Sequence, residues 1–560
     1  RSYYRSSTLP TSLDRLPPSV PEGSKRDKNM LNWVWENTLS YTTIIKDVHN
    51  LSAIAGWTAQ KESVNTSLLA GNGYPNDLVH TMNAASAITN WSATAYEWSL
   101  LSALARVQYS YKGKYLLSAA ARMDGSSRFG KNNRWGMFPS ASAGWYISEE
   151  DFMKDIKWLT SLKLRASYGI SGNFNIGNYE YYATLSEDNY VFGKADGTLA
   201  SGLRPATAGN PDLGWEKTAM FNLGLEIGLF NMLTLELDLY NSNTTDMLLN
   251  VPVAEFSGFS TVPMNIGKVN NKGVEFAIST TNTWGDFTWN NRFNISANRN
   301  EVKDLGGVDE MITTSESVTF ITKVGEPIGN YYTLVTDGVF ANQAEIDNSK
   351  NPDKSQRKYA YVSGAKPGDF RFKDMDGNME IDENDRTITG NYMPKFTYGF
   401  STELKYKWFD LSVALQGVQG NKIANIFRRY IDNMEGGNNC QVDALDRWQS
   451  ESNPGSGYVV RANRSATGMN GTTSTWHIED GSYMRIKNIT FGYTLPKSLL
   501  TNVGISRARV YFSTQNPFTF TKYSGYNPEV NMKGGSLTPG IDYGTYPLSK
   551  SFVFGLNVTF

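Results

Sequence analysis

An acidic stretch at residues 374–385, DMDGNMEIDEND, carries the clearest ligand chemistry in the sequence. Its oxygen ligands stand at positions 1, 3, 5, 7, 9 and 12, the spacing by which an EF-hand-type loop wraps calcium. The candidate ligands are Asp374, Asp376, Asn378, Glu380 through its carbonyl, Asp382 and Asp385. Met379 occupies position 6, where a sharp turn favours glycine, and the last ligand is the shorter Asp. Two interpretations stay open: a structural Ca²⁺ site that stiffens a loop, or a solvated acidic turn.

Other site chemistry is sparse. Cys440 is the one cysteine, so the chain has neither an internal disulfide nor a cysteine metal cluster. Its three histidines lack the spacing of a zinc motif. The formal net charge is −1, which gives no basic field for nucleic acid. We therefore expect a protein that is not an enzyme, that has no cofactor besides the candidate calcium, and that does not bind nucleic acid.

The chain combines few charges with many amphipathic rings. Charged residues make up 19% and aromatic residues 13%, including 31 Tyr and 14 Trp. Membrane β-barrels have such a composition because Tyr and Trp settle at both membrane–water boundaries. Aromatic faces also stack on sugars and pack on peptides, so the aromatic residues of long connections are candidate substrate contacts, or simply pack within loops. The candidates are Trp91, Tyr181, Tyr430 and Trp476.

The dominant hydrophobic period is two, the period of β-strands. Leu233, Leu235, Leu237 and Leu239 alternate with Thr234, Glu236 and Asp238, for example. The sequence contains no run of about 18 apolar residues, so it predicts no transmembrane helix. Fifteen strands are predicted, near 31–45, 51–62, 98–111, 115–124, 135–147, 161–170, 215–229, 232–241, 272–280, 286–299, 395–407, 408–417, 482–495, 506–516 and 547–560.

Short and long connections alternate along these strands, with 125–134 as an exception. The long ones are 63–97, 171–214, 242–271, 300–394, 418–481 and 517–546. Outer-membrane barrels have tight periplasmic turns at one rim and long external loops at the other, whereas a soluble sandwich has no reason to sort its loops in this way. The alternation therefore favours a barrel. The sequence also ends on an aromatic strand, with Phe552, Phe554, Leu556, Val558 and Phe560 alternating to the last residue, as in barrels that the outer-membrane assembly machinery inserts.

The energetics of lipid explain the pattern of charges. Every backbone polar group must be paired in hydrocarbon, so a sheet that spans it must close on itself. A Lys or Arg on the lipid face costs roughly 2–4 kcal/mol at the midplane. Segment 482–495 breaks the rule, because Arg485 and Lys487 share parity with Ile489. Either a β-bulge or an end that emerges from the membrane would explain it.

Several segments resemble the SusC/RagA-like family of TonB-dependent outer-membrane transporters of Bacteroidetes. They are DGSSRFGKNNRWGMFPSASAGWYISEEDFM (124–153), LKLRASYGISGN (162–173), GNPDLGWEKT (209–218), NIGKVNNKGVEF (265–276), GSYMRIKNITFGYTLP (481–496) and RVYFSTQNPFTFTKYSGYNPEV (509–530). The resemblance implies an antiparallel transmembrane barrel of about 22 strands around a plug. We expect residues 1–30 to be an irregular external segment, and 31–560 to be the C-terminal part of the barrel. We expect the plug and the TonB box to be missing from this sequence.

The resemblance also implies a function. We expect TonB-dependent import of oligosaccharides across the bacterial outer membrane, together with a SusD-like surface lipoprotein, in pairs that can themselves dimerise. Further interactions would be with TonB, through the plug, and with outer-membrane lipids. Oligopeptide import by the same mechanism, a passive outer-membrane porin and a soluble all-β protein are the alternatives.

Overall fold

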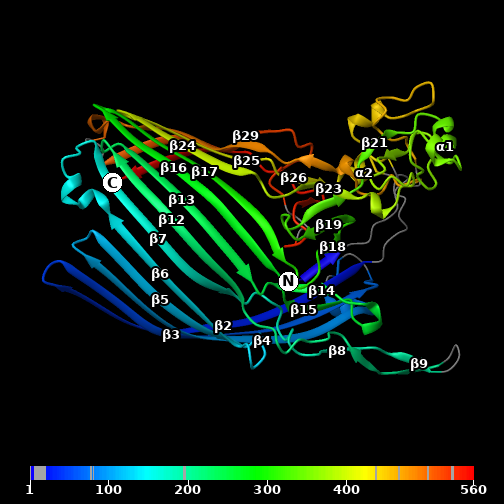
Figure 1. The fold of residues 1–560 in the computed structure, drawn as a ribbon, viewed down its shortest axis with the longest axis horizontal. Coiled ribbons are helices and arrows are strands. Elements are labelled where there is room, and N and C mark those ends of the chain that lie inside the picture. The colour runs from blue at the N-terminus through cyan, green and yellow to red at the C-terminus, as the bar shows by residue number, and fades with distance from the viewer. Residues whose placement is uncertain are drawn as a thin grey trace. The chain divides into compact units, whose positions relative to one another are not determined.

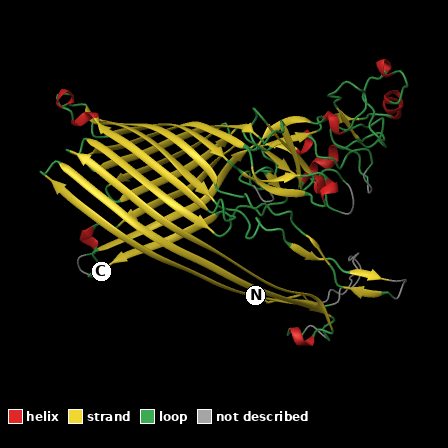
Figure 2. Cartoon of the chain, turned by 60° about the horizontal axis from the view of Figure 1, so that its bottom comes forward, coloured by secondary structure: helices red, strands yellow, loops and turns green. Residues whose placement is uncertain are grey.

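The computed structural model describes residues 2–5, 21–75, 78–79, 81–192, 197–434, 438–463, 467–500, 504–530 and 535–560. It divides into two compact units. The first comprises Arg1–Ala143, Tyr168–Ala219 and Thr244–Ile266, and the second Gly144–Ser167, Met220–Asn243 and Gly267–Phe560. Long antiparallel strands run through both units (Figures 1 and 2). Among the described residues, no helix is long and apolar enough to cross a membrane.

In the first unit, consecutive strands pair antiparallel from β1 to β5. The short strand β1 (Ser2–Arg5) is followed by the long strands β2 (Glu22–Ile45), β3 (His49–Asn72), β4 (Ala87–Tyr111), β5 (Tyr115–Ser126) and β6 (Trp135–Tyr146). Three small hairpins join β8 (Leu185–Glu187) to β11 (Leu203–Pro205), β9 (Tyr190–Phe192) to β10 (Thr198–Ala200), and β14 (Leu248–Pro252) to β15 (Thr261–Asn265). Strands β6, β7 (Leu159–Asn173), β12 (Glu216–Leu229) and β13 (Leu233–Thr245) each have residues in both units.

In the second unit, the long strands also pair antiparallel in chain order. They are β16 (Lys268–Trp284), β17 (Phe287–Asp304), β24 (Phe396–Tyr406), β25 (Phe409–Gln419), β28 (Tyr483–Thr494), β29 (Arg507–Thr521) and β31 (Ser551–Thr559). The connections hold β18 (Glu310–Ser315), β19 (Val318–Lys323), β20 (Asn330–Thr333), β21 (Thr336–Val339), α1 (Gln343–Ser349), β22 (Phe370–Phe372), β23 (Thr387–Asn391), β26 (Lys422–Asn425), α2 (Arg428–Ile431), β27 (Ile478–Asp480) and β30 (Ile541–Asp542).

All fifteen predicted strands are present, but the first three are longer than predicted. Strand β2 begins at Glu22, so 22–30 is not irregular as expected, and Ser2–Arg5 forms a further strand against it. Strand β3 continues to Asn72 and strand β4 already begins at Ala87, so most of the predicted loop 63–97 is sheet. The remainder of the predicted segment 1–30 lies outside the described residues. The alternation of short and long connections is confirmed.

The short turns follow from backbone chemistry. Lys112 and Gly113 connect β4 to β5 with φ of +52° and +69°, the left-handed conformation that matches the twist of a tight hairpin. Aromatic pairs gather at these turns, as expected for a membrane–water boundary. Ring pairs stand there at Tyr111–Tyr115, Trp158–Phe230, Trp284–Phe287 and Phe409–Tyr493.

The two faces of the strands differ in polarity, as contact with lipid on one side requires. On the apolar face, the side chains stay exposed instead of packing into a protein interior, and Phe554 of β31 is 81% exposed. Its alternate neighbours Phe552 and Leu556 are exposed as well. On the polar face of the second unit, Arg165 donates to Glu226 (3.1 Å) and Asp238 (2.7 Å). Solvent outside the sheet must therefore be apolar for the apolar face to be stable.

A β-bulge explains the charged residues of β28. The register of β28 against β25 shifts between Ile486 and Asn488, which pair with the adjacent residues Leu415 and Ala414 and leave Lys487 as the extra residue. Beyond the bulge the parity reverses, and Arg485 is only 1% exposed. Its guanidinium donates to Glu529 (2.6 Å) and Asn527 (2.7 Å). Of the two explanations left open by the sequence, the bulge accounts for Arg485.

Candidate functional site

The acidic loop 374–385 lies between β22 and β23 in the second unit. It brings together three of the six predicted ligands: carboxylate oxygens of Asp374, Asp376 and Asp385 lie within 4.8 Å of one another. These are positions 1, 3 and 12 of the predicted calcium loop. Three like charges at this distance repel each other unless a cation or hydrogen bonds compensate them.

Backbone amides hold two of these carboxylates in place. Asp374 accepts hydrogen bonds from the N–H groups of Gly377 and Met379, both at 2.8 Å. Asp385 accepts from Met375 (2.7 Å) and Asp382 (2.8 Å). Burial opposes ionisation of Asp374, but these amides outweigh it and lower the pKa of its carboxyl. The carboxylate therefore stays available to a cation over a wider pH range.

The other predicted ligands have partners within the loop. The side chain of Asn378 accepts from the Glu380 N–H (2.7 Å), and Glu380 pairs with Lys354 (3.0 Å). Asp382 accepts from Asn384 and caps a short 3₁₀ turn. Three converging carboxylates suit a hard cation. Calcium therefore remains a prediction that rests on Asp374, Asp376 and Asp385.

Replacing Met379 with glycine should strengthen calcium binding. Met379 has a φ of +62°, a conformation that costs a non-glycine residue about 1 kcal/mol or more. Met379→Gly should therefore lower the calcium Kd by roughly fivefold, since about 1.4 kcal/mol is tenfold. Calorimetric titration of the full-length protein checks this, with Asp374→Asn as the variant that should not bind. An absence of heat in both the wild type and Met379→Gly would remove the calcium site.

The aromatic candidates belong to different elements. Trp91 lies in β4 and not in a loop as predicted, and it is 73% exposed. Tyr181 and Tyr182 follow β7, with ring centroids 4.1 Å apart. Tyr430 lies in α2, half-exposed, with its hydroxyl 2.5 Å from that of Tyr543. Only some of the predicted substrate contacts therefore present an exposed aromatic ring on a loop.

Trp476 has a packing role in the structure. Its ring lies under the guanidinium of Arg428, 4.1 Å from the centroid, and it packs against a buried apolar cluster. Arg428 also donates to the Trp476 carbonyl and to Asp432, each at 2.5 Å. The half-buried ring is therefore already engaged, and the loop-packing interpretation fits Trp476 better than a substrate contact.

Three long connections of the second unit, 305–395, 420–482 and 522–550, share common cores, and we call their described residues the loop cap. One core joins β21 and β22 to Met434, Val459 and Val460. A second joins Phe320 and Tyr331 to Ile426 and Ile541. These buried cores of the second unit thus lie in its long connections. Figure 1 labels elements of these connections, among them β19, β21 and α2. These loops can hold side chains in fixed positions.

A buried acid at the centre of the loop cap was not predicted from the sequence. Asp369 is 0% exposed and accepts from Arg461 (2.9 Å), Thr467 (2.7 Å), Asn470 (3.0 Å) and the Lys366 N–H (2.9 Å). Since these partners come from two separate connections, the carboxylate joins them. A turn sequence such as PGDF carries no signal for this role, because its partners are about 100 residues away in the chain.

Lowering the pH should weaken the loop cap around His477. Burial, then Arg428 and Arg429, lower the pKa of His477 from 6.5 to about 3. Below pH 6.5 the unfolded chain binds a proton that the folded imidazole refuses, so stability falls with pH down to about 3. Between pH 7 and pH 5, the free energy of opening the loop cap locally should fall by about 2 kcal/mol.

Hydrogen exchange of residues 474–478, divided by the intrinsic rate at each pH, measures this loss. His477→Gln should remove most of the pH dependence. The control matters because a second group titrates near His477. Burial raises the pKa of Asp432, although Arg428 opposes the shift, and a raised carboxyl pKa makes the folded state more stable as the pH falls. Equal pH dependence in the wild type and His477→Gln would contradict the assignment to His477.

Comparison with known proteins identifies the family. Residues 1–516 match the model described as "TonB dependent receptor-like, beta-barrel". The chain is 35% identical over 549 residues to TonB-dependent receptor P3 of Formosa agariphila, covering 95% of this chain and 53% of that protein. It is 33% identical over 484 residues to TonB-dependent receptor SusC of Bacteroides thetaiotaomicron, covering 84% of this chain and 44% of that protein.

Comparison with solved structures supports the same family. The RagAB peptide transporter superposes with a TM-score of 0.81 and 27% identity, covering all of this chain and 58% of the other. The chain belongs to the TonB-dependent receptor family of outer-membrane β-barrel proteins and is SusC/RagA-like. Members of this family are transporters and not, in general, enzymes. The chain spans about half the length of the curated relatives it matches.

Proposed function

We propose that the protein to which this chain belongs imports oligosaccharides across the outer membrane in a TonB-dependent manner. The likeness to SusC over 84% of the chain carries the proposal. Exposed loop tyrosines, such as Tyr182 and Tyr430, offer faces on which sugar rings can stack. A SusD-like lipoprotein would cover the long-loop end, and TonB would act through a plug domain.

The strand count fits a closed barrel. The fifteen long strands β2 to β31 and seven upstream strands would give about 22, the number in large outer-membrane transporters. The short strand β1 pairs with β2 as the last residues of a seventh upstream strand would. Closure would pair every backbone group within the hydrocarbon.

Oligopeptide import is the second candidate, because the superposed RagAB structure is of a peptide transporter. Loop aromatics pack on peptides as readily as on sugars. A strain lacking the gene and complemented with the full-length form would decide between the cargoes. Uptake of fluorescent oligosaccharides that is lost without TonB supports the proposal. Uptake of labelled peptides alone would overturn the glycan cargo, and equal uptake without TonB would indicate a passive porin.

A further inference from the structure

A polar hollow lies at the end of the first unit where β6 begins. Its volume is about 250 Å³, and its walls include Asn133, Trp135, Asp212, Lys217, Asp246 and Asn265. Most of these residues belong to the segments 124–153, 209–218 and 265–276, which carry the family resemblance. Neither the proposed import nor the acidic loop gives this hollow a role.

Part of the lining builds the hollow. The Asn133 side chain donates to the Asp212 carbonyl (2.6 Å), and Asn265 accepts from the Gly214 N–H (2.7 Å) and donates to the Gly214 carbonyl (2.8 Å). The buried Trp215 donates its indole N–H to the Arg134 carbonyl (2.9 Å). These bonds tie the three segments together, so the hollow is preformed.

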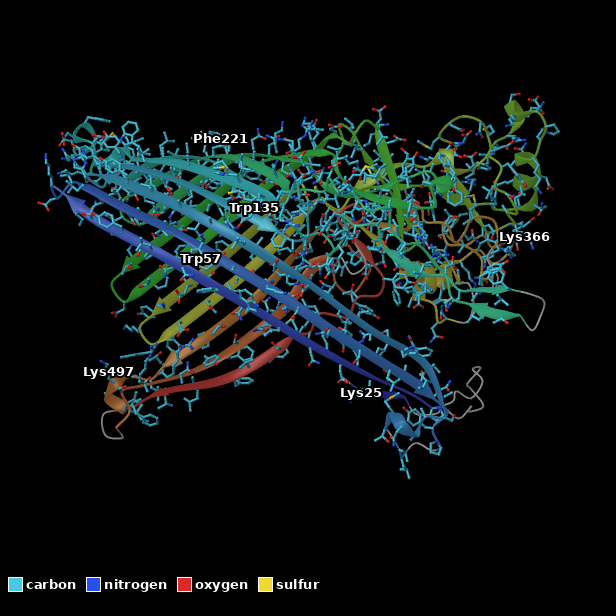
Figure 3. The ribbon with its side chains drawn as sticks, turned by 90° about the horizontal axis from the view of Figure 1, so that it is seen from below. Lys25, Trp57, Trp135, Phe221, Lys366 and Lys497 are labelled. Atoms are coloured by element: carbon cyan, nitrogen blue, oxygen red, sulfur yellow. The ribbon has the colours of Figure 1, made fainter. Side chains whose placement is uncertain are left out.

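The other groups of the lining are left for a ligand. Trp135, labelled in Figure 3, is 48% exposed. One side of its ring is fixed against the backbone at Gly125. The Asp212 carboxylate has no hydrogen bond or ion pair within the described part of the chain. Lys217 and Asp246 form a loose, half-exposed pair at 3.7 Å. The hollow thus offers an aromatic face, two carboxylates and one ammonium.

We propose that this hollow binds the ring of a neutral pyranose. The indole provides an apolar plane for the C–H face of the ring. Sugar hydroxyls both donate and accept, so they can serve Asp212, Asp246 and Lys217 together. A phosphate would face two carboxylates, and a cation would face Lys217, so both charged ligands are disfavoured. A volume below the roughly 300–1,000 Å³ of drug-sized pockets suits one small ring.

The position of the hollow suggests where the sugar comes from. Trp135 shares parity with the exposed Met137 and lies beside Gly125, which shares parity with the exposed Met123. These residues belong to the apolar face, at the end of β5 and β6 remote from the short turn 112–114. A site at this boundary can take a sugar of a soluble oligosaccharide or of a glycan chain on an outer-leaflet lipid.

Titration of the full-length protein in detergent with methyl β-glucopyranoside and methyl β-galactopyranoside tests the site, with saturation-transfer NMR as readout. We expect saturable binding of at least one glycoside, weakened tenfold or more in Trp135→Leu and in Asp212→Asn. Trp57→Leu, a matched control on β3 (Figure 3), should bind as the wild type does. Failure of both glycosides to bind, unchanged binding in Trp135→Leu, or tighter binding of glucose 6-phosphate or methylguanidinium would overturn the proposal.

A second arm assigns the source. The protein is placed in nanodiscs that contain lipopolysaccharide with or without a neutral O-chain, and the glycoside titration is repeated. Glycoside binding that is weakened only by the O-chain supports the site and assigns it to membrane glycans. Equal binding in both discs supports the site and assigns it to soluble sugars. These results do not depend on TonB or on import.

Discussion

Asp369→Ala is expected to open the loop cap at a cost of about 3–5 kcal/mol. The substitution leaves the Arg461 guanidinium, largely buried, without its carboxylate, and removes the acceptor of Thr467 and Asn470. Removing one partner of a buried ion pair is strongly destabilising, because the other charge stays buried and unpaired. The strands of the sheet should be unaffected, since Asp369 belongs to the loop cap.

Hydrogen exchange of the full-length protein in detergent measures the effect. Residues around Phe370 and Val460 should exchange faster by a factor of about 100 or more, while β24 and β25 keep their protection. Asp347→Ala, at an exposed position of helix α1, is the matched control and should change exchange little. Full protection of the cap in Asp369→Ala would show that the carboxylate does not join the two connections.

Leu117→Arg is expected to destabilise the inserted barrel by roughly 2–4 kcal/mol. Leu117 lies on the apolar face of β5 and is exposed there. A guanidinium in this position would have to leave water for hydrocarbon. The measurement is guanidinium unfolding of the full-length protein from lipid vesicles.

Ser118→Arg is the control, because the adjacent residue points to the opposite, polar face, where it stands across from Gln108. It should cost less than about 1 kcal/mol, since the wet face accepts charge. Equal destabilisation by the two substitutions would mean that the faces of β5 do not differ in their surroundings.

The strands could be predicted from the sequence, but not their full lengths. Residues such as Asp27, Lys28 and Asn29 are polar in succession, so the period of two disappears while the backbone continues in β2. Their pairing with Asn65–Ser67 of β3 keeps the ladder intact. Periodicity reports what surrounds a strand and not where the hydrogen bonds end. Beyond the apolar zone, both faces are wet and the signal is lost.

The candidate site could also be predicted only in part, because only some of its contacts join residues that are close in the sequence. Asp374, Asp376 and Asp385 are close in sequence, so their convergence followed from spacing. The partners of Asp369 and Arg485 lie far away along the chain and carry no local pattern. The bulge at Lys487 likewise depends on pairing with β25. Contacts of this kind are visible only after the strands have been placed.

Spin labels along β31 test the central claim, that alternate side chains of the strands face lipid. In a Cys440→Ser background of the full-length protein, single cysteines at positions 552–558 are labelled in liposomes. Their accessibility to oxygen and to a water-soluble nickel chelate is then compared. Positions 552, 554, 556 and 558 should favour oxygen, and the positions between them the chelate, with a period of two. Uniform access to the chelate along the strand would contradict a strand that spans the membrane.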